Sequence, residues 1–278
     1  MNFGKFRKNL FSFRETGDTS KPFLDHLEDL RRMLIKSIVV LAVFMMLGFT
    51  FRSQIARFVQ HPLAAVNPKS VDNLQSLGVA DSMMISFDLA FYAGIVLAFP
   101  FLLYFLAEFI LPGLTPREKK AALPAALVGF GLFLSGAAFA YYELLPQTLE
   151  WFYADAKSMG WVPTWTVHEY YSFATQFIIA FGLAAELPVV ILVLVRIGIL
   201  NTAKLRKLRP YMLILVTTFA AVIVPTTDVL TLVLMAAPMY LLYEISILLA
   251  HWMEKKTRST EVLEAPAEIK DSSEESDK

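Results

Sequence analysis

Long apolar blocks, separated by shorter polar stretches, dominate the chain from residue 34 to residue 250. A helix needs about 20 apolar residues to cross the hydrocarbon core of a bilayer, and several of these blocks reach that length. The pattern therefore predicts an all-α integral membrane protein. We expect six transmembrane helices, over residues 34–51, 87–111, 121–145, 171–195, 211–224 and 229–250.

The basic residues lie almost entirely on one side of these six blocks. All but four of the 25 lysines and arginines fall in the N-terminal segment, in the stretches 112–120 and 196–210, or in the C-terminal tail. Cytoplasmic loops are enriched in lysine and arginine, so we expect both termini to be cytoplasmic. The opposite loops, 52–86 and 147–170, contain aromatic residues and prolines. They are expected to form short amphipathic caps on the outer surface, in preference to an aromatic cage for a ligand.

Composition divides the chain into three regions. Residues 1–19 form a basic cytoplasmic tail, and residues 20–253 form the six-span membrane domain. Residues 254–278 are polar and acidic with no apolar period, which predicts a disordered cytoplasmic tail. The two halves of the membrane domain show no sequence repeat, which argues against a secondary transporter built from inverted repeats.

The overall composition also restricts the chemistry. Hydrophobic residues make up 56% of the chain and the mean hydropathy is +0.53, as expected for a membrane protein. The net charge is zero, so charge indicates no nucleic-acid partner. There is no cysteine, and the four histidines lie near the membrane edges, so neither a disulfide nor a metal site is expected. No HExxH, GxSxG or paired membrane aspartates are present, so we expect neither an enzyme nor a cofactor.

One acid interrupts an apolar block. Glu186 lies in IIAFGLAAELPVVILVLVRIG, residues 178–198, where a charged group costs about 2.5–3.5 kcal/mol at the bilayer centre. We expect its side chain to be hydrogen-bonded, largely neutral and facing a cavity, where it contacts an inserted peptide or a partner helix. Pro188 cannot donate to the carbonyl of Ala184, which leaves a backbone acceptor nearby. Two alternatives are an acid that serves helix packing alone and the proton site of a transporter.

Two acids flank the spans on the predicted cytoplasmic side. Asp29 lies in an amphipathic helix predicted over residues 20–36, ahead of a basic cluster. Glu118 ends the sequence Thr115-Pro116-Arg117-Glu118, which has the form of a capping box. Each acid therefore has a purely structural interpretation, as a favourable charge at a helix start. Each is also a candidate partner for a cationic ligand.

The fifth predicted span is short. Residues 211–224 would reach about 21 Å as helix, against a hydrocarbon core of roughly 30 Å. A span of this length deforms the bilayer locally or requires a protein neighbour. We therefore expect a thinned membrane and a lateral docking face for a protein partner at this hairpin. Thr231 is expected to supply polar contacts there.

Several of these segments resemble the TatC family, the multispanning receptor subunit of the twin-arginine protein translocase. The resemblance extends over roughly residues 20–255, in the family's order and spacing. Met33 stands where the family's N-terminal motif often has a second arginine, and VPTTD stands where TPPD is common. The segments that carry the resemblance are FLDHLEDLRRML, FPFLLYFLAEFILPGLTPREKK, FGLAAELPVVILVLVRIGI, LRKLRPY, VPTTD and AAPMYLLYEI.

The resemblance implies a fold, a function and a set of partners. The fold would be a curved, glove-like arrangement of six helices with a concave face. The function would be to bind paired-arginine signal peptides in the bacterial cytoplasmic membrane, so that folded proteins are exported at the expense of the proton-motive force. The partners would be TatA-type single-span subunits, TatB where present, and further copies of the chain. By position, the resemblance places signal-peptide binding at Asp29, Phe109 and Glu118, the intramembrane acid at Glu186, and the acid of the outer turn at Asp228.

Overall fold

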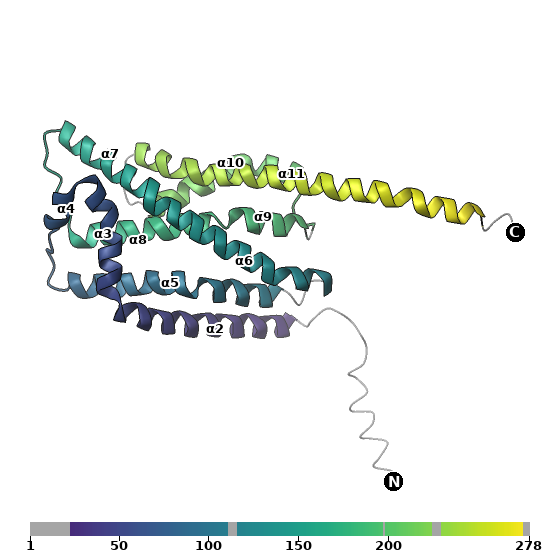
Figure 1. Ribbon diagram of the computed structural model, residues 1–278, viewed down its shortest axis with the longest axis horizontal. Helices are drawn as coiled ribbons and strands as arrows, with labels where there is room; N and C mark the ends of the chain where they lie inside the picture. The colour runs from purple at the N-terminus through teal and green to yellow at the C-terminus, as the bar shows by residue number, and fades with distance from the viewer. Residues whose placement is uncertain (1–22, 111–115, 197, 224–228, 275–278) are drawn as a thin grey trace, which may run out of the picture.

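The computed structural model describes residues 23–110, 116–196, 198–223 and 229–274, with most side chains described as far as Lys255. Apart from an isolated parallel bridge between Gln75 and Thr166, the regular structure in these ranges is helical (Figure 1). The helices are α2 (Phe23–Thr50), α3 (Arg52–Val66), α4 (Pro68–Asp72), α5 (Asp81–Ile110), α6 (Pro116–Phe139), the π-helical turn η3 (Ala140–Leu144), α7 (Leu145–Ser158), α8 (Val167–Ala184), α9 (Leu187–Arg196), α10 (Thr202–Ile223) and α11 (Val229–Glu274).

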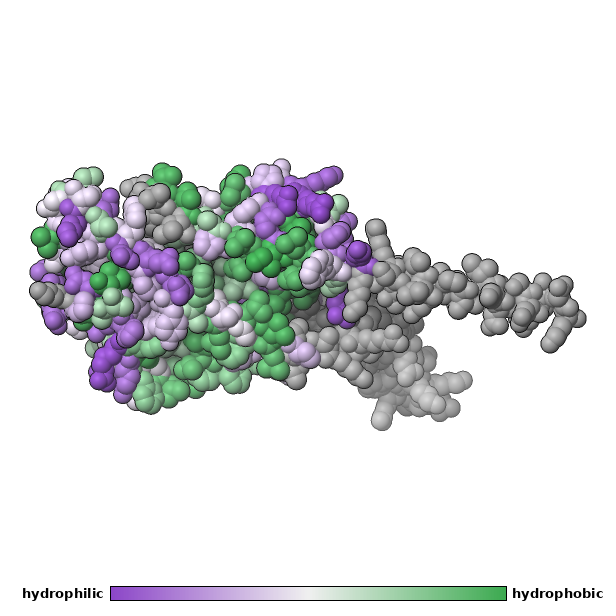
Figure 2. Space-filling model, turned by 45° about the horizontal axis from the view of Figure 1, so that its top comes forward, coloured by the Kyte–Doolittle hydropathy of each residue, from purple (hydrophilic) through white to green (hydrophobic). Residues whose placement is uncertain are grey.

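Four helical stretches in the described ranges are long and apolar enough to cross a membrane. They overlap the first four predicted spans, and α10 and α11 overlap the fifth and sixth. The protein is thus an all-α, multi-pass membrane protein, while the total of six spans stays a prediction. Figure 2 shows hydrophobic residues gathered over the middle of one face, with hydrophilic residues toward its ends. The four stretches are Asp25–Thr50, Asp81–Phe109, Ala126–Ser158 and Val167–Arg196.

Helices α2 and α5 lie side by side along their length (Figure 1), and small residues set their separation. A Cβ added at Gly94 would lie 3.0 Å from the backbone nitrogen of Met45, and one added at Gly48 would lie 3.0 Å from the carbonyl oxygen of Ala90. Between helices in lipid, such close backbone approach replaces the hydrophobic driving force that operates in water. The two glycines therefore hold the first span against the second.

The third span continues further than the sequence predicts. The prediction places a loop from residue 147, but α6 passes through η3 into α7, which ends only at Ser158. Pro146 is the second residue of α7, directly after the π-helical turn, and the helix continues past it. The first half of the segment expected to form a cap over 147–170 is therefore helical and continuous with α6. The π-helical turn accommodates the transition.

Helix α3 forms a cap within residues 52–86, and the hydroxyl groups of two tyrosines hydrogen-bond it to the spans. Helix α3 buries Val59 and Leu63, whereas its neighbour α4 is a single short turn. The hydroxyl of Tyr170 donates to the carbonyl of Val59 at 2.6 Å, and that of Tyr141 donates to the carbonyl of Phe58 at 2.7 Å. Helix α3 is thereby fixed across the ends of the spans, opposite the start of α2 and the end of α11 (Figure 1).

Polar contacts join α10 to α11. Arg209 donates from Nη2 to Glu244 Oε2 at 2.7 Å, and the hydroxyl of Tyr240 donates to the other oxygen of that carboxylate at 3.0 Å. One end of α10 is anchored by Thr202, whose backbone nitrogen and hydroxyl donate to Glu254 at 2.8 and 2.7 Å. These polar contacts hold α10 against α11 at the end that carries the basic residues, in addition to the apolar contacts between the two helices.

The lengths of α10 and α11 can be compared with two expectations, a short fifth span and a disordered C-terminal tail. The apolar part of α10 after Pro210 covers 211–223, about 20 Å of helix, close to the length expected for a short fifth span. Helix α11 runs on to Glu274, through the tail for which the sequence predicts disorder. A polar segment gains little stability in water from helix formation alone. Disorder of this tail in solution therefore stays a prediction.

Candidate functional site

The start of α2 meets the end of α5. The imidazole of His26 stacks on the ring of Phe109, with centroids 4.5 Å apart and planes 20° from parallel. Lys36 reaches across the same pair of helices and donates to both oxygens of Glu108, at 3.0 and 3.2 Å. Its ammonium group also lies 5.7 Å from the centre of the Phe105 ring. These contacts bring the acidic first turns of α2 to the aromatic end of α5.

Carboxylates gather on those first turns. Asp25 lies in the first turn, and Glu28 pairs with Arg31 at 3.4 Å and with Arg32 at 3.3 Å on its own helix. These pairs are solvent-exposed, and exposed pairs contribute only about 0.2–1 kcal/mol. Asp29 is half-buried and lies three residues after His26, a spacing that puts two residues on one helical face. Asp29 therefore shares the face on which His26 meets Phe109.

The other predicted site residues are only partly described by the structure. Glu118 lies in the first turn of α6, which begins at Pro116 as the capping-box motif predicts, but its side chain is outside the described part of the structure. Thr231 lies in α11, again with its side chain outside the described part. Asp228 is outside the described residues altogether. Of the three proposed signal-binding residues, the structure thus brings Asp29 and Phe109 to one junction.

Sequence reasoning did not single out Glu108 or the stacking role of His26. The partner of Glu108, Lys36, is 72 residues away, and nothing in the local sequence reports that pairing. The only available signal was the position of Glu108 immediately before Phe109, at the end of an apolar span. A charge at that point is expected to lie near the membrane surface, where it can find an opposite charge.

The intramembrane acid lies at a break in the fourth span. Helix α8 ends at Ala184 and α9 begins at Leu187, so Glu186 occupies the intervening turn and Pro188 follows inside α9. The backbone nitrogen of Glu186 donates to the carbonyl of Leu183 at 3.1 Å, a tighter turn than that of an α-helix. The break falls where proline removes the regular donor.

The side chain of Glu186 is packed between spans. It is 8% exposed, and a Cβ added at Gly129 of α6 would lie 2.9 Å from its Oε2 and 3.2 Å from Leu103 of α5. A side chain at position 129 would therefore require the Glu186 carboxyl group to move. Within the described residues, Oε1 has no hydrogen-bond partner. The expected burial is therefore present, but these residues do not supply the expected hydrogen bond at that oxygen.

The fold and these sites define a class: a multispanning helical membrane protein with an acidic and aromatic junction at one end and a carboxyl group inside its bundle. The family profile described as "Sec-independent protein translocase protein (TatC)" matches residues 25–238. The chain belongs to the TatC family. Its transport role agrees with the expectation that it is not an enzyme, and the family gives no support to the secondary-transporter alternative.

Individual relatives agree with the profile. TatC of Akkermansia muciniphila is 44% identical over 191 residues; the match covers 69% of this chain but only 55% of the relative, so the chain spans about half of that relative's length. TatC of Deinococcus radiodurans is 38% identical, over 83% of this chain and 86% of the relative. The solved "Twin Arginine Translocase Receptor- TatC" superposes with a TM-score of 0.75 at 33% identity, covering 82% of this chain and 98% of that one.

Proposed function

We propose that this chain is the receptor subunit that binds paired-arginine signal peptides at the junction of α2, α5 and α6. It then assembles with TatA-type single-span subunits, with TatB where present and with its own copies, to export folded proteins using the proton-motive force. The observation that carries the proposal is the stack of His26 on Phe109, which joins the acidic turns of α2 to the end of α5. The start of α6, with Glu118, follows only six residues after α5 ends.

The proposed chemistry follows from the side chains at this junction. A guanidinium group offers a planar fork of donors that a carboxylate accepts in a two-pronged pair, which an ammonium group cannot copy. Asp29 and Glu118 are the proposed acceptors, and Phe109 provides an apolar surface beside them. The stacked imidazole keeps that ring in place at the end of α5. The site would therefore bind a peptide with paired arginines more tightly than one with paired lysines.

We further propose the orientation and the partner contacts. We place the chain in the bacterial cytoplasmic membrane. The distribution of basic residues supports an orientation with both termini inside, which puts α3 and α4 on the outer side. The short hairpin of α10 and α11 exposes Val222, Val233 and Phe219, and we propose it as the docking face for a single-span subunit. Asp228 and Thr231 would supply polar contacts there. Glu186 would contact the inserted peptide or a partner helix.

The decisive substitution for the recognition site is Glu118→Gln. Glutamine keeps the capping box but removes the charge-assisted bond, which is typically worth about 1.5–3 kcal/mol, or roughly 10- to 150-fold in affinity. Binding of an arginine-pair peptide to protein in nanodiscs should fall by that order, beside a lysine-pair control. Asp29→Asn should act in the same direction, and the double change should be less than additive. Unchanged affinity in Glu118→Gln would leave helix capping as the whole role of this acid.

A further inference from the structure

A lysine of the first span occupies a cation site at the end of the second. Lys36 of α2 donates from Nζ to both carboxylate oxygens of Glu108 on α5, at 3.0 and 3.2 Å. The same ammonium group lies 5.7 Å from the centre of the Phe105 ring, within the range of a cation–π contact. We call Glu108 and Phe105 the inner cation site. The chain fills this site with a cation of its own.

The inner cation site adjoins the signal-binding junction on its membrane side. Glu108 directly precedes Phe109, whose ring stacks on His26. Asp29 shares the helical face of His26, because it follows three residues later. Lys36 follows Asp29 by about two helical turns and lies inside the first predicted span. Lys36 therefore reaches Glu108 from the membrane side, whereas Asp29 lies toward the start of α2.

The order of segments in a signal peptide assigns one arginine to this site. The basic segment of a signal peptide precedes its apolar segment, so the second arginine of the pair lies nearer the membrane. The Cα atoms of adjacent residues are about 3.8 Å apart, and both arginine side chains are long. One pair can therefore reach Asp29 and Glu108 together. The second arginine is the one that faces Glu108.

Exchange with Lys36 would distinguish arginine from lysine. A lysine of the peptide gains nothing at Glu108, because it replaces one ammonium group by another. A guanidinium group can instead form two parallel bonds to the carboxylate and lie flat on the Phe105 ring. The first arginine, once bound, holds the second at a high effective concentration, which offsets the intramolecular advantage of Lys36. The resident lysine thus raises the selectivity of the site for arginine.

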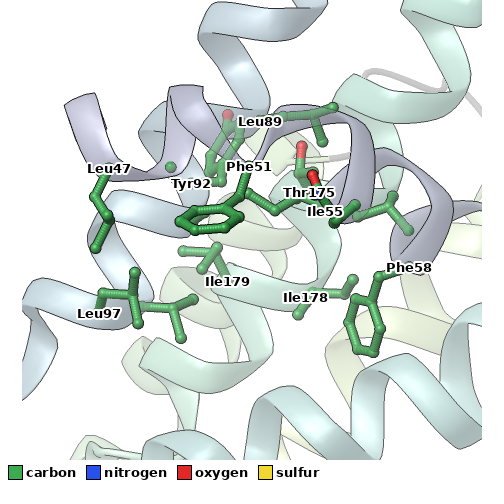
Figure 3. A pocket seen from close by; sticks show the side chains of 15 residues that line it. Leu47, Phe51, Ile55, Phe58, Leu89, Tyr92, Leu97, Thr175, Ile178 and Ile179 are labelled. Atoms are coloured by element: carbon green, nitrogen blue, oxygen red, sulfur yellow. The ribbon is translucent and has the colours of Figure 1, made fainter. Parts of the chain in front are cut away.

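The open apolar groove between α2, α5 and α8 does not offer a comparable site for a cation (Figure 3). Its lining on α2 begins at Leu47, about three turns beyond Lys36, and it includes Leu97 of α5 and Ile178 of α8. None of the 15 described residues that line it is charged. A cation placed there would lack an ion-pair partner. Cation binding therefore belongs to the junction end of α2 and α5.

We propose that Glu108 is a third acceptor of the recognition site, and that the second arginine of the signal peptide displaces Lys36 from it. The first arginine binds Asp29 and Glu118. In the free protein Lys36 keeps Glu108 paired, so a carboxylate at the membrane edge is not left without a cation. The role of Glu108 rests on the function proposed above and adds the residue that receives one particular arginine.

The test is a double-mutant cycle between Glu108 and the second arginine, with the full chain in nanodiscs. Fluorescence anisotropy measures the binding of an arginine-pair peptide and of peptides with lysine in the first or in the second position. With the unsubstituted protein, lysine in the second position should weaken binding by up to about fivefold. Glu108→Gln should remove this loss and leave the loss from lysine in the first position unchanged.

Glu28→Gln is the matched control for the cycle. The side chain of Glu28 is 44% exposed, against 51% for Glu108, and it pairs with Arg31 and Arg32 of its own helix. This substitution should leave both losses unchanged. A second variant tests the exchange at constant charge. Lys36→Arg puts a guanidinium group of the chain in the inner cation site, so it should lower affinity for the arginine-pair peptide by up to about fivefold.

The outcomes separate this role of Glu108 from the function proposed above. An undiminished loss from lysine in the second position in Glu108→Gln would overturn the role of Glu108 and leave the receptor function intact. Unchanged affinity in Lys36→Arg would show that Lys36 stays in place, and would overturn the exchange. Equal binding of arginine-pair and lysine-pair peptides by the unsubstituted protein would overturn the receptor function itself, and the role of Glu108 with it.

Discussion

Lys36→Gln should strengthen the binding of an arginine-pair signal peptide. Lys36 neutralises Glu108 through contacts of 3.0 and 3.2 Å, and the two side chains are 49% and 51% exposed. An exposed pair of this kind is worth about 0.2–1 kcal/mol, so its loss should lower the free energy of unfolding by no more than that. The same substitution releases a carboxylate beside Phe109. If an incoming arginine uses it, affinity should rise by a factor of up to about five.

The assay is fluorescence anisotropy of a labelled peptide with protein in nanodiscs, at low and at high salt. The gain should shrink at high salt, because screening weakens exposed charge pairs. The control is the same substitution made in a Glu108→Gln background, where no carboxylate is released and little gain is expected. An equal gain in both backgrounds would show a general effect of removing positive charge. The absence of any gain in Lys36→Gln would refute a role for Glu108 at the junction.

Three further predictions follow from the packing and the topology. Glu186→Gln should transport better than Glu186→Ala in a vesicle export assay, because glutamine keeps a polar group beside Gly129; equal and complete loss in both would show that ionisation is required. Gly94→Val should cost about 1–3 kcal/mol, read as a lower melting temperature in detergent, since its Cβ meets the backbone of Met45 at 3.0 Å. Lys157→Cys, in this chain without cysteine, should be labelled only from the outer side, and labelling only from the cytoplasm would reverse the topology.

The helical spans were predictable from the sequence because apolar length alone determines them. The extension of the third span was not. Pro146 and the polar residues after it suggest a loop, yet the helix passes Pro146 directly after a π-helical turn and continues to Ser158. The break in the fourth span was partly predictable, because Pro188 removes a backbone donor beside Glu186.

The candidate site was predictable only in part. Asp29 and Phe109 could be placed at one end of the spans by charge and resemblance. Their junction depends on His26 stacking on Phe109, and nothing local in the sequence specifies that contact between distant segments. The carboxyl group of Glu186 lies against Gly129, in another helix. Such pairings belong to the packing of helices, which local periodicity does not encode.

The central claim, recognition of paired arginines at the junction of α2 and α5, is tested most directly by photocrosslinking from that junction. A photoreactive benzoylphenylalanine replaces the partly buried Phe109, or replaces Phe91 as a control in the first half of α5, where the ring is exposed. Illumination with an arginine-pair signal peptide should give an adduct from position 109 and none from position 91. A lysine-pair peptide should give much less. No adduct from position 109, or equal adducts with both peptides, would contradict the account.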